Sequence, residues 1–136
     1  MYWGGYYDIG GTRYWFKYNG EMISGWGRIV GDGDDYWVYC KSSGAGYTGW
    51  VKSGSDWYYA EKGDLYYGIY LINGVRYCFD DYTGAMDKDI FVYDISSDSV
   101  TSWPYHFDAD GKGTNGWRSY GGYSYYYVNG YPSRRS

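Results

Sequence analysis

A cluster of aromatic residues recurs about every 20 residues along this chain, and this regularity limits the fold more than any other feature. The clusters are centred on residues 15, 37, 58, 77, 105 and 125, at spacings of 22, 21, 19, 28 and 20. Self-similarity at a nearly fixed period is the sequence signature of repeat proteins. The chain is therefore expected to be an array of small repeats.

Each repeat is predicted to be a β-hairpin. An aromatic strand is followed by a glycine-containing turn such as Asn19-Gly20, and the return strand leads to Gly-Trp or a remnant of it. The dipeptide is intact at Gly25-Trp26, Gly49-Trp50 and Gly116-Trp117 and degenerate at Gly68-Ile69 and Asp89-Ile90. A single hairpin is marginally stable in water, so its rings need neighbouring hairpins as cover. The predicted fold class is thus all-β, a solenoid of stacked β-hairpins with about six repeats of roughly 20 residues.

Aromatic side chains must supply most apolar contacts, because aliphatic residues are scarce. The 136 residues include 8 Trp, 23 Tyr and 4 Phe, or 26% aromatic residues, together with 23 Gly. Leu, Ile, Val and Phe make up about 15% of the chain, below the roughly 20% that suggests disorder when net charge is high. The net charge is only −4, and rings bury large apolar areas. We expect folding on aromatic contacts, with Cys40 and Cys78 reduced and packed because they lie in different repeats.

Charge and hydropathy exclude two classes of partner. Lys and Arg number 12 against 16 Asp and Glu, so non-specific binding of nucleic acid is not expected, although rings could stack on bases. The sequence has no run of about 18 apolar residues that could insert into a membrane. The first residues lack the basic and apolar regions of a signal peptide, which predicts either a cytoplasmic chain or a piece cut from a longer exported protein.

One polar segment interrupts the repeats. Residues 94–102 are rich in serine and lengthen the spacing before the cluster at residue 105. The predicted organisation is hairpin repeats over residues 1–93, a loop insertion over residues 94–102, and the final hairpin repeats of the same solenoid over residues 103–136. A joint between two separate parts is the alternative interpretation of residues 94–102, and it is less favoured because the second part would be very small.

Residues 48–63, with the sequence TGWVKSGSDWYYAEKG, resemble one full unit of the cell-wall-binding repeats. This superfamily comprises the choline-binding repeats of streptococcal surface proteins and phage lysins, with relatives in glucan-binding domains and clostridial toxin repeats. Residues 73–86 and 105–111 are more similar to the toxin and glucan-binding branch. The resemblance covers roughly residues 3–93 and 103–131. It implies a left-handed solenoid with ligand sites between consecutive hairpins.

The resemblance also implies which residues form ligand sites. A choline site combines the Trp of Gly-Trp, the first aromatic residue of the next cluster and an aromatic residue of the following hairpin. Two sets match this pattern: Trp50, Trp57 and Tyr77 with Met86 as a candidate floor, and Trp26, Tyr36 and Tyr58. Trp117 is a further candidate with an incomplete set. Other ring positions are replaced by Ile69, Ile90 and Arg76, so about two competent sites are expected.

Rings in this arrangement could hold two kinds of ligand. A quaternary ammonium group has no N–H, so ring faces would recognise it at roughly 0.5–2 kcal/mol per ring. Such sites are weak, in the millimolar range, and gain from repetition along a polymer. A sugar would stack on the same rings and form hydrogen bonds, for example with Lys52, Asp56, Asn73 or Arg76. The alternative to ligand binding is that the rings simply build the core.

Short motifs that could indicate catalysis, a cofactor or a metal site are not supported by the residues around them. Residues 111–116 match G-x-G-x-x-G but open no predicted helix. Residues 108–111 begin like a calcium loop, but Lys112 occupies the next ligand position. His106 is the single histidine, and a packed neutral imidazole is its expected role. No catalytic residue, cofactor or metal site is therefore predicted.

The function predicted from the sequence is that of a non-catalytic module that attaches a larger protein to a bacterial surface polymer. Its ligand is expected to be choline-decorated teichoic acid or a wall glycan, and its location extracellular or at the cell wall. Two alternatives stay open: glucan or host-glycan binding as in toxin repeats, and a structural or protein-interaction module that has lost its ligand sites. In the second alternative, exposed rings would pack against a partner or a second copy in a homodimer.

Overall fold

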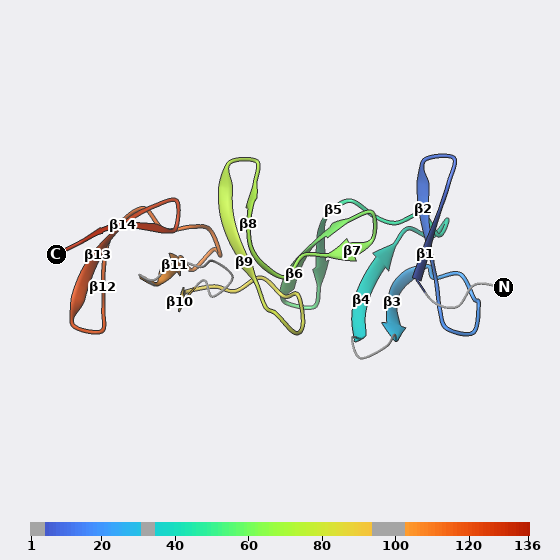
Figure 1. The fold of residues 1–136 in the computed structure, drawn as a ribbon, viewed down its shortest axis with the longest axis horizontal. Coiled ribbons are helices and arrows are strands. Elements are labelled where there is room, and N and C mark those ends of the chain that lie inside the picture. Colours follow the sequence, from blue (N-terminus) through green and yellow to red (C-terminus); the bar gives the residue numbers. More distant parts are fainter. Residues whose placement is uncertain (1–4, 31–34, 94–102) are drawn as a thin grey trace. The chain divides into compact units, whose positions relative to one another are not determined.

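The computed structural model describes residues 5–30, 35–93 and 103–136, and within these ranges the regular structure is entirely β (Figure 1). The predicted all-β class is confirmed. No helix in these ranges is long and apolar enough to cross a membrane. The strands are β1 (Gly5–Ile9), β2 (Thr12–Phe16), β3 (Gly25–Val30), β4 (Asp35–Cys40), β5 (Gly49–Ser53), β6 (Asp56–Glu61), β7 (Asp64–Leu65), β8 (Gly68–Ile72), β9 (Val75–Phe79), β10 (Ile90–Val92), β11 (Tyr105–Phe107), β12 (Gly116–Tyr120), β13 (Tyr123–Val128) and β14 (Tyr131–Arg135).

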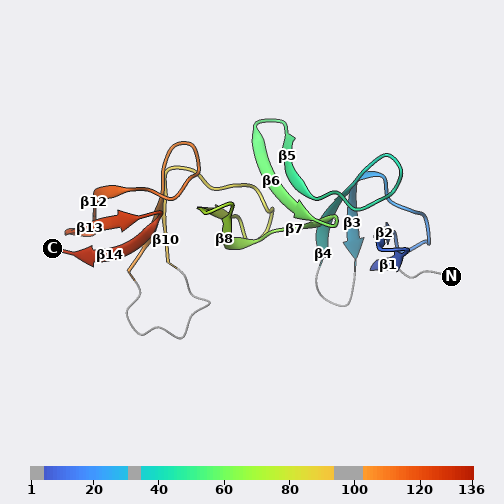
Figure 2. The same cartoon turned by 90° about the horizontal axis from the view of Figure 1, so that it is seen from above.

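The chain divides into two compact units, Met1–Tyr66 and Tyr67–Ser136. Antiparallel pairs of successive strands form the hairpins β1–β2, β3–β4 and β5–β6 in the first unit. In the second unit they form β8–β9, β10–β11 and β12–β13. A further strand extends the last hairpin of each unit: β7 pairs with β6, and β14 pairs with β13, where the three strands lie side by side in Figure 2.

The predicted partner of the aromatic strand is wrong for most hairpins. The prediction paired this strand with the segment that follows it, whereas β4 pairs along its whole length with the preceding Gly-Trp strand, β3. The following segment returns only as an isolated bridge, as between Phe16 and Met22 or between Phe79 and Met86. Among the described strands, β6 and β13 alone also pair with the strand that comes next, β7 and β14.

Turn geometry explains this pairing. Gly10-Gly11 joins β1 to β2 with φ angles of 60° and 84°, and Asn73-Gly74 joins β8 to β9 with φ angles of 51° and 81°. Two-residue turns with both φ angles positive match the right-handed twist of paired strands. The turn after β2 is wider, because Lys17 N donates to Glu21 O across Asn19-Gly20. These tight turns therefore select the β1–β2 and β8–β9 hairpins, and the predicted turn at Asn19-Gly20 becomes part of a connecting loop.

Equivalent glycines join the hairpins within each unit. Gly46 N donates to Arg13 O in the first unit, and Gly113 N donates to Arg76 O in the second, at 2.7 and 2.8 Å. A Cβ atom at either glycine would collide with the backbone of the last hairpin of the same unit. Both units thus use the same close backbone approach, which only glycine permits.

A long side chain on the first hairpin of each unit anchors the last hairpin. Trp15 Nε1 donates to Lys62 O at 2.7 Å in the first unit. In the second unit Arg76 Nη1 donates to Asn129 O at 3.0 Å, and Asn129 Oδ1 accepts a hydrogen bond from Arg76 N. The anchoring groups differ in chemistry but reach the equivalent turn.

Aliphatic side chains contribute more to the cores than the composition predicted, because the few that the chain has are concentrated among the buried residues. In the first unit Trp15, which is 1% exposed, packs with Ile23, Ile29, Val38 and Cys40. Buried rings of the second unit are Phe79, Phe107, Tyr125 and Tyr127. Cys40 and Cys78 are both buried free thiols, which confirms that they are packed.

The predicted loop insertion, residues 94–102, lies outside the described residues. The strands on its two sides, β10 and β11, pair with each other within the second unit. The boundaries at residues 93 and 103 stay a prediction.

Candidate functional site

Each hairpin presents a row of three side chains across its strands, which we call a cross-strand row. Its first member belongs to the Gly-Trp strand or its counterpart, and its second member lies directly opposite on the aromatic strand. The third member lies beside the second on the segment that follows, as when Tyr47 N donates to Tyr39 O at 3.1 Å. Directly opposed residues of paired strands point to the same face, so the members of a row are neighbours.

The cross-strand rows differ in chemistry between hairpins. Within the described ranges and in chain order they are Tyr6–Trp15–Ile23, Trp26–Tyr39–Tyr47, Trp50–Tyr59–Tyr66, Ile69–Cys78–Asp87, Phe91–His106–Thr114 and Trp117–Tyr126–Arg134. The rows that begin with Trp26 and Trp50 consist of rings throughout. The other rows replace at least one ring by an aliphatic, polar or charged side chain.

Trp26 lies among three other rings of the first unit. Its ring centroid is 5.0 Å from that of Tyr39, 6.5 Å from that of Trp37 and 5.1 Å from that of Tyr58 on the next hairpin. Trp37 is 41% exposed, so the group is open to solvent beside this ring. Burial, with a smaller effect of the neighbouring Asp56 carboxylate, raises the pKa of the Tyr58 hydroxyl, which keeps this ring neutral.

The structure brings together two residues of the predicted set Trp26, Tyr36 and Tyr58. The rings of Trp26 and Tyr58 are in contact, whereas Tyr36 packs at 6.0 Å from Trp15 beside the core of the first unit. Successive side chains of a strand point to opposite faces. Tyr36 and Val38 therefore face the core side of β4.

Trp37 and Tyr39, on the other face of β4, are the ring neighbours of Trp26 that the sequence prediction missed. The strand alternation of residues 35–40 could have separated them from Tyr36. Finding them also required the correct hairpin pairing, since Tyr39 is the cross-strand partner of Trp26.

The predicted set Trp50, Trp57 and Tyr77 draws on both units. Within the first unit, Trp50 lies 6.3 Å from Trp57 and 5.3 Å from Tyr59, measured between ring centroids. Lys52 Nζ lies 5.7 Å from the ring centroid of Trp57, so one face of this exposed ring has a cation of the protein nearby. The combination with Tyr77 stays a prediction.

Tyr77 and Met86 belong to the second unit. The ring of Tyr77 is 6.5 Å from that of Phe79 on the same strand, β9. Met86 is half-buried, and a Cβ atom on Gly111 would lie 2.5 Å from its Cε atom, so the thioether packs directly against this turn. The proposed role of Met86 as the floor of a site stays a prediction.

Trp117 is 45% exposed and stands in a row that ends in an arginine. Its ring centroid is 5.3 Å from that of Tyr126. The guanidinium carbon of Arg134 lies 5.5 Å from the Trp117 ring and 4.8 Å from the Tyr126 ring. Arg134 thus makes the kind of cation–π contact that a ligand cation would make at this position.

The degenerate dipeptide Gly68-Ile69 begins a row without rings. Ile69 faces Cys78, and Asp87 N donates to Cys78 O at 2.8 Å. The Cys78 thiol donates to Asp87 Oδ2 at 3.4 Å. Burial, followed by the charge of Asp87, raises the pKa of the Cys78 thiol, so this sulfur is a neutral donor and not a nucleophile.

The other degenerate dipeptide, Asp89-Ile90, is displaced by one residue from the predicted register. Ile90 pairs with Phe107, which places Phe91 opposite His106 in the tryptophan position. The rings of Phe91 and His106 are 4.3 Å apart, so this row keeps an aromatic first member. Phe91 follows Asp87 by four positions, whereas Trp26 follows Ile23 by three, and this one additional residue shifts the ring out of the predicted register.

His106 is packed, as predicted. It is 6% exposed, and its Nδ1 atom is 2.6 Å from Thr114 Oγ1. Burial, with a smaller effect of Arg118, lowers the pKa of the imidazole. The histidine is therefore a neutral member of its row.

The acidic turn at residues 108–111 is held by its own backbone. Asp108 Oδ1 accepts hydrogen bonds from Asp110 N at 2.9 Å and Lys112 N at 3.0 Å. In the part of the chain that the structure describes, no three His, Cys, Asp or Glu side chains are grouped to hold a metal ion. The aspartate stabilises a turn, a common role for this residue type.

Solved structures of similar proteins share this arrangement of strands. CbpJ from Streptococcus pneumoniae is 30% identical, with a TM-score of 0.59, and the match covers 93% of this chain and 41% of CbpJ. Choline binding protein F from Streptococcus pneumoniae is 25% identical, with a TM-score of 0.56, and the match covers 90% of this chain and 42% of that protein. The chain thus spans about two fifths of the length of these proteins.

A phage protein extends the similarity at the level of the fold. The multimodular pneumococcal cell wall endolysin from phage Cp-1, solved in complex with choline, is 21% identical, with a TM-score of 0.54. The match covers 97% of this chain and 38% of the endolysin. No protein-family model matches the sequence, and no curated protein sequence matches it significantly. The Gly-Trp hairpins, their aromatic rows and the similarity to the two pneumococcal proteins place this chain in the cell-wall-binding repeat superfamily that includes the choline-binding proteins.

Proposed function

We propose that this chain is a non-catalytic module that binds choline groups of a bacterial cell-wall polymer. The observation that best supports this proposal is the ring group around Trp26, in which Trp37, Tyr39 and Tyr58 all lie within 6.5 Å. Choline is expected to bind where Trp26, Trp37 and Tyr58 present their faces. The neighbouring carboxylate of Asp56 adds negative potential on the Tyr58 side.

The chemistry of these rings suits a cation without N–H groups. A quaternary ammonium ion gains roughly 0.5–2 kcal/mol from each well-placed ring, and three rings together correspond to a dissociation constant near the millimolar range. The methyl groups of choline also gain from contact with apolar ring surface. One site is therefore weak, and attachment to a polymer depends on several sites.

The proposed fold at the whole-chain level is a solenoid of about six hairpins, each contributing to a site with its neighbour. Within the first unit, Trp50 would then contribute to a second cage with Trp57 and Tyr59, whose ring centroids lie 6.3 and 5.3 Å from its own. Two cages on one chain raise the effective concentration of a repetitive ligand for the second cage. The module is proposed to act outside the cell, at the wall, as part of a larger protein.

The similarity to choline binding protein F supports choline as the ligand. A wall glycan or α-glucan is the second candidate, because Trp37 and Trp57 are 41% and 38% exposed and offer faces on which a sugar can stack. The two candidates differ in one respect: a sugar needs hydrogen-bonding partners around the ring, whereas choline needs ring faces alone.

Tryptophan fluorescence during ligand titration tests the proposal. Choline is expected to change the emission of the wild-type chain saturably, with a midpoint in the millimolar range. Trp26→Ala should lose about half of the change, since one of two cages is removed, and the double variant Trp26→Ala/Trp50→Ala should lose it completely. Trp117→Ala is the matched control and should keep the response.

The same titration with α-glucan oligomers separates the alternatives. A saturable response to glucan with none to choline would replace the proposed ligand by a sugar. If neither ligand changes the emission while the chain dimerises with rising concentration, the protein-interaction alternative holds and the cage proposal is refuted.

A further inference from the structure

A pocket of about 920 Å³ lies in the second unit, at the hairpin whose cross-strand row is Ile69–Cys78–Asp87. All three members of this row line it. In the row of Trp26 the equivalent positions hold three rings. Replacement of large rings by an isoleucine, a cysteine and an aspartate removes side-chain volume at this point, and this accounts for the open space.

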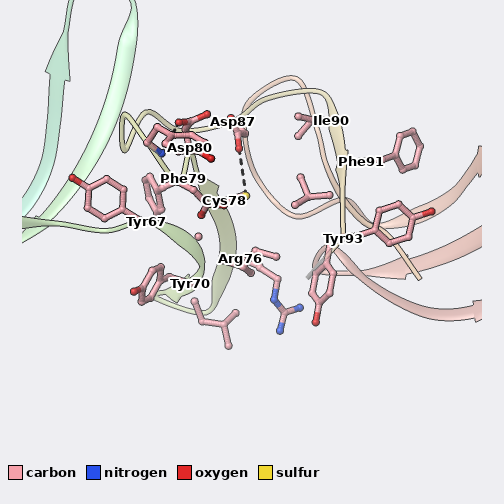
Figure 3. A pocket seen from close by; sticks show the side chains of 17 residues that line it. Tyr67, Tyr70, Arg76, Cys78, Phe79, Asp80, Asp87, Ile90, Phe91 and Tyr93 are labelled. Carbon is pink, nitrogen blue, oxygen red and sulfur yellow. Dashed lines mark hydrogen bonds between the residues drawn. The ribbon is translucent and has the colours of Figure 1, made fainter. Parts of the chain in front are cut away.

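The walls of the pocket are apolar and aromatic. Tyr67, Tyr70 and Phe79 come from the β8–β9 hairpin and the residue that precedes it, and Figure 3 shows Ile90, Phe91 and Tyr93 on the other side. This lining resembles small-molecule sites in general, which combine an apolar surface with a few placed polar groups. The polar groups of this pocket decide what it can hold.

Carboxylates dominate the polar lining. The lining includes three carboxylates, Asp80, Asp81 and Asp87, and one cation, Arg76. Arg76 is already engaged, because its guanidinium donates to Asn129 O and lies 5.5 Å from the ring of Tyr105. The electrostatic potential of the pocket therefore favours a positively charged occupant.

Asp87 is the carboxylate held in the row itself. Its N–H donates to Cys78 O, and its Oδ2 atom accepts from the Cys78 thiol (Figure 3). The first bond fixes the backbone of Asp87, and the second holds its carboxylate beside Cys78, which also lines the pocket. Burial raises the pKa of Asp87, and a bound cation would offset that effect by stabilising the charged form.

We propose that this pocket binds a protonated primary amine, such as an amino alcohol or an amino sugar, through a charge-assisted hydrogen bond to Asp87. A carboxylate discriminates between cations in a way that rings do not. A primary ammonium donates N–H groups to it at close range, whereas three methyl groups hold the charge of a quaternary ammonium further away. The short carbon chain of the amine packs against Ile69 and the aromatic walls.

This site differs in position and chemistry from the proposed choline cage. The cage around Trp26 belongs to the first unit and uses ring faces, and the pocket belongs to the second unit and uses a carboxylate. The chain would then distinguish two kinds of amine on one surface polymer.

Ethanolamine and choline form a matched pair of probes, since they differ only by the three methyl groups on nitrogen. We would follow backbone amide and indole N–H signals by NMR during separate titrations of the full chain. Ethanolamine is expected to shift the amides of Ile69, Cys78 and Asp87 saturably. Asp87→Asn, which keeps an acceptor for the Cys78 thiol, should weaken ethanolamine binding at least about tenfold.

Asp110→Asn is the matched control, because Asp110 is an exposed aspartate of another turn, and it should bind ethanolamine as the wild type does. Unchanged indole signals in Asp87→Asn would show that the fold is intact. Failure of ethanolamine to shift these amides, equal binding of ethanolamine to Asp87→Asn, or an equal loss of choline binding in Asp87→Asn would each overturn the proposal. Trp26→Ala separates the two sites, since it should abolish the choline shifts around residue 26 and leave ethanolamine binding unchanged.

Discussion

At the residue scale, the members of a cross-strand row differ in chemistry between hairpins that share the same backbone arrangement. Trp26, Tyr39 and Tyr47 form a continuous set of rings, with centroids 5.0 and 5.5 Å apart. The same three places on the fourth hairpin hold Ile69, Cys78 and Asp87, and a pocket opens there. Different side chains at the same backbone positions thus give a set of packed rings on one hairpin and a pocket with a carboxylate on another.

The buried imidazole of His106 makes stability depend on pH. Its pKa is lowered in the folded chain, so the unfolded chain takes up the proton first as pH falls. The contribution of His106 to stability is complete above the ordinary pKa of about 6.5 and is lost as pH falls below it. We expect the free energy of unfolding to decrease between pH 7 and pH 5.

Thermal unfolding of the wild type and His106→Gln over this pH range measures that contribution. The glutamine variant removes the titrating group, so its stability should fall less than that of the wild type over the same interval. Aspartates with raised pKa values titrate in both proteins and cancel in the difference. Equal pH dependence in the two proteins would show that the imidazole is not the responsible group.

The resemblance to the cell-wall-binding repeats predicted part of the candidate site. The Gly-Trp dipeptide identified Trp26 and Trp50, and the resemblance supplied Tyr58, which lies 5.1 Å from Trp26. Tyr36 was separated from this group because one residue along a strand exchanges the two faces. Asp87 could not be found from the sequence, because its place beside Cys78 depends on the length and path of the loop between them.

At the element scale, the tight turns govern which strands pair. The sequence contains two sets of candidate hairpin turns. One set includes Gly10-Gly11 and Asn73-Gly74, and the other includes the glycine turns that follow the aromatic clusters, such as Asn19-Gly20. Period and spacing fit either pairing equally well, since the first and fourth hairpins each have a two-residue turn between their strands and a glycine turn after the aromatic strand. At Gly10-Gly11 and Asn73-Gly74, the positive φ angles at both positions fit the two-residue hairpin turn.

Strand β14 adds a cation to the last hairpin. Arg134 lies over the rings of Trp117 and Tyr126 at 5.5 and 4.8 Å, so a ligand cation has to compete with it. We expect the Trp117 indole signal of the wild type to respond little to choline. Arg134→Ala should expose both ring faces and make this signal titrate with a midpoint in the millimolar range.

Arg135→Ala is the control, because Arg135 lies over Tyr123 at 4.0 Å and not over Trp117. NMR observation of the indole N–H groups distinguishes Trp117 from the other tryptophans in both variants. A wild-type Trp117 signal that already titrates with choline at the midpoint of Arg134→Ala would contradict the role given to Arg134.

At the scale of the whole molecule, the two units repeat one arrangement of hairpins. Each unit has an extended last hairpin, a close backbone contact at a glycine, and a long side chain that reaches the equivalent turn. The sequence predicted the hairpin class but not this higher repeat, because the anchoring side chains Trp15 and Arg76 share no chemistry. What they share is a target, the carbonyl of a turn residue.

Gly46 and Gly113 are expected to be equally intolerant of a side chain. Gly46→Ala should destabilise the first unit, and Gly113→Ala the second, by about 1–3 kcal/mol each, because the added methyl group meets backbone atoms that cannot move aside. Ser53→Ala, on an exposed position, should change stability by less than about 0.5 kcal/mol.

Hydrogen exchange followed by NMR shows which unit loses stability in each glycine variant. Amide protection should fall mainly within residues 5–66 in Gly46→Ala and mainly within residues 67–136 in Gly113→Ala. Equal loss of protection across the whole chain in both variants would show that the glycine contacts do not stabilise their units separately.

Locating choline on the protein shows whether the rings around Trp26 bind it. Intermolecular nuclear Overhauser effects between the choline methyl protons and the protein protons report direct contacts between the ligand and individual side chains. We expect such effects to the rings of Trp26, Trp37 and Tyr58, and their disappearance in Trp26→Ala. Choline methyl groups that contact none of these rings at saturating concentration would contradict the claim that this aromatic group is a choline site.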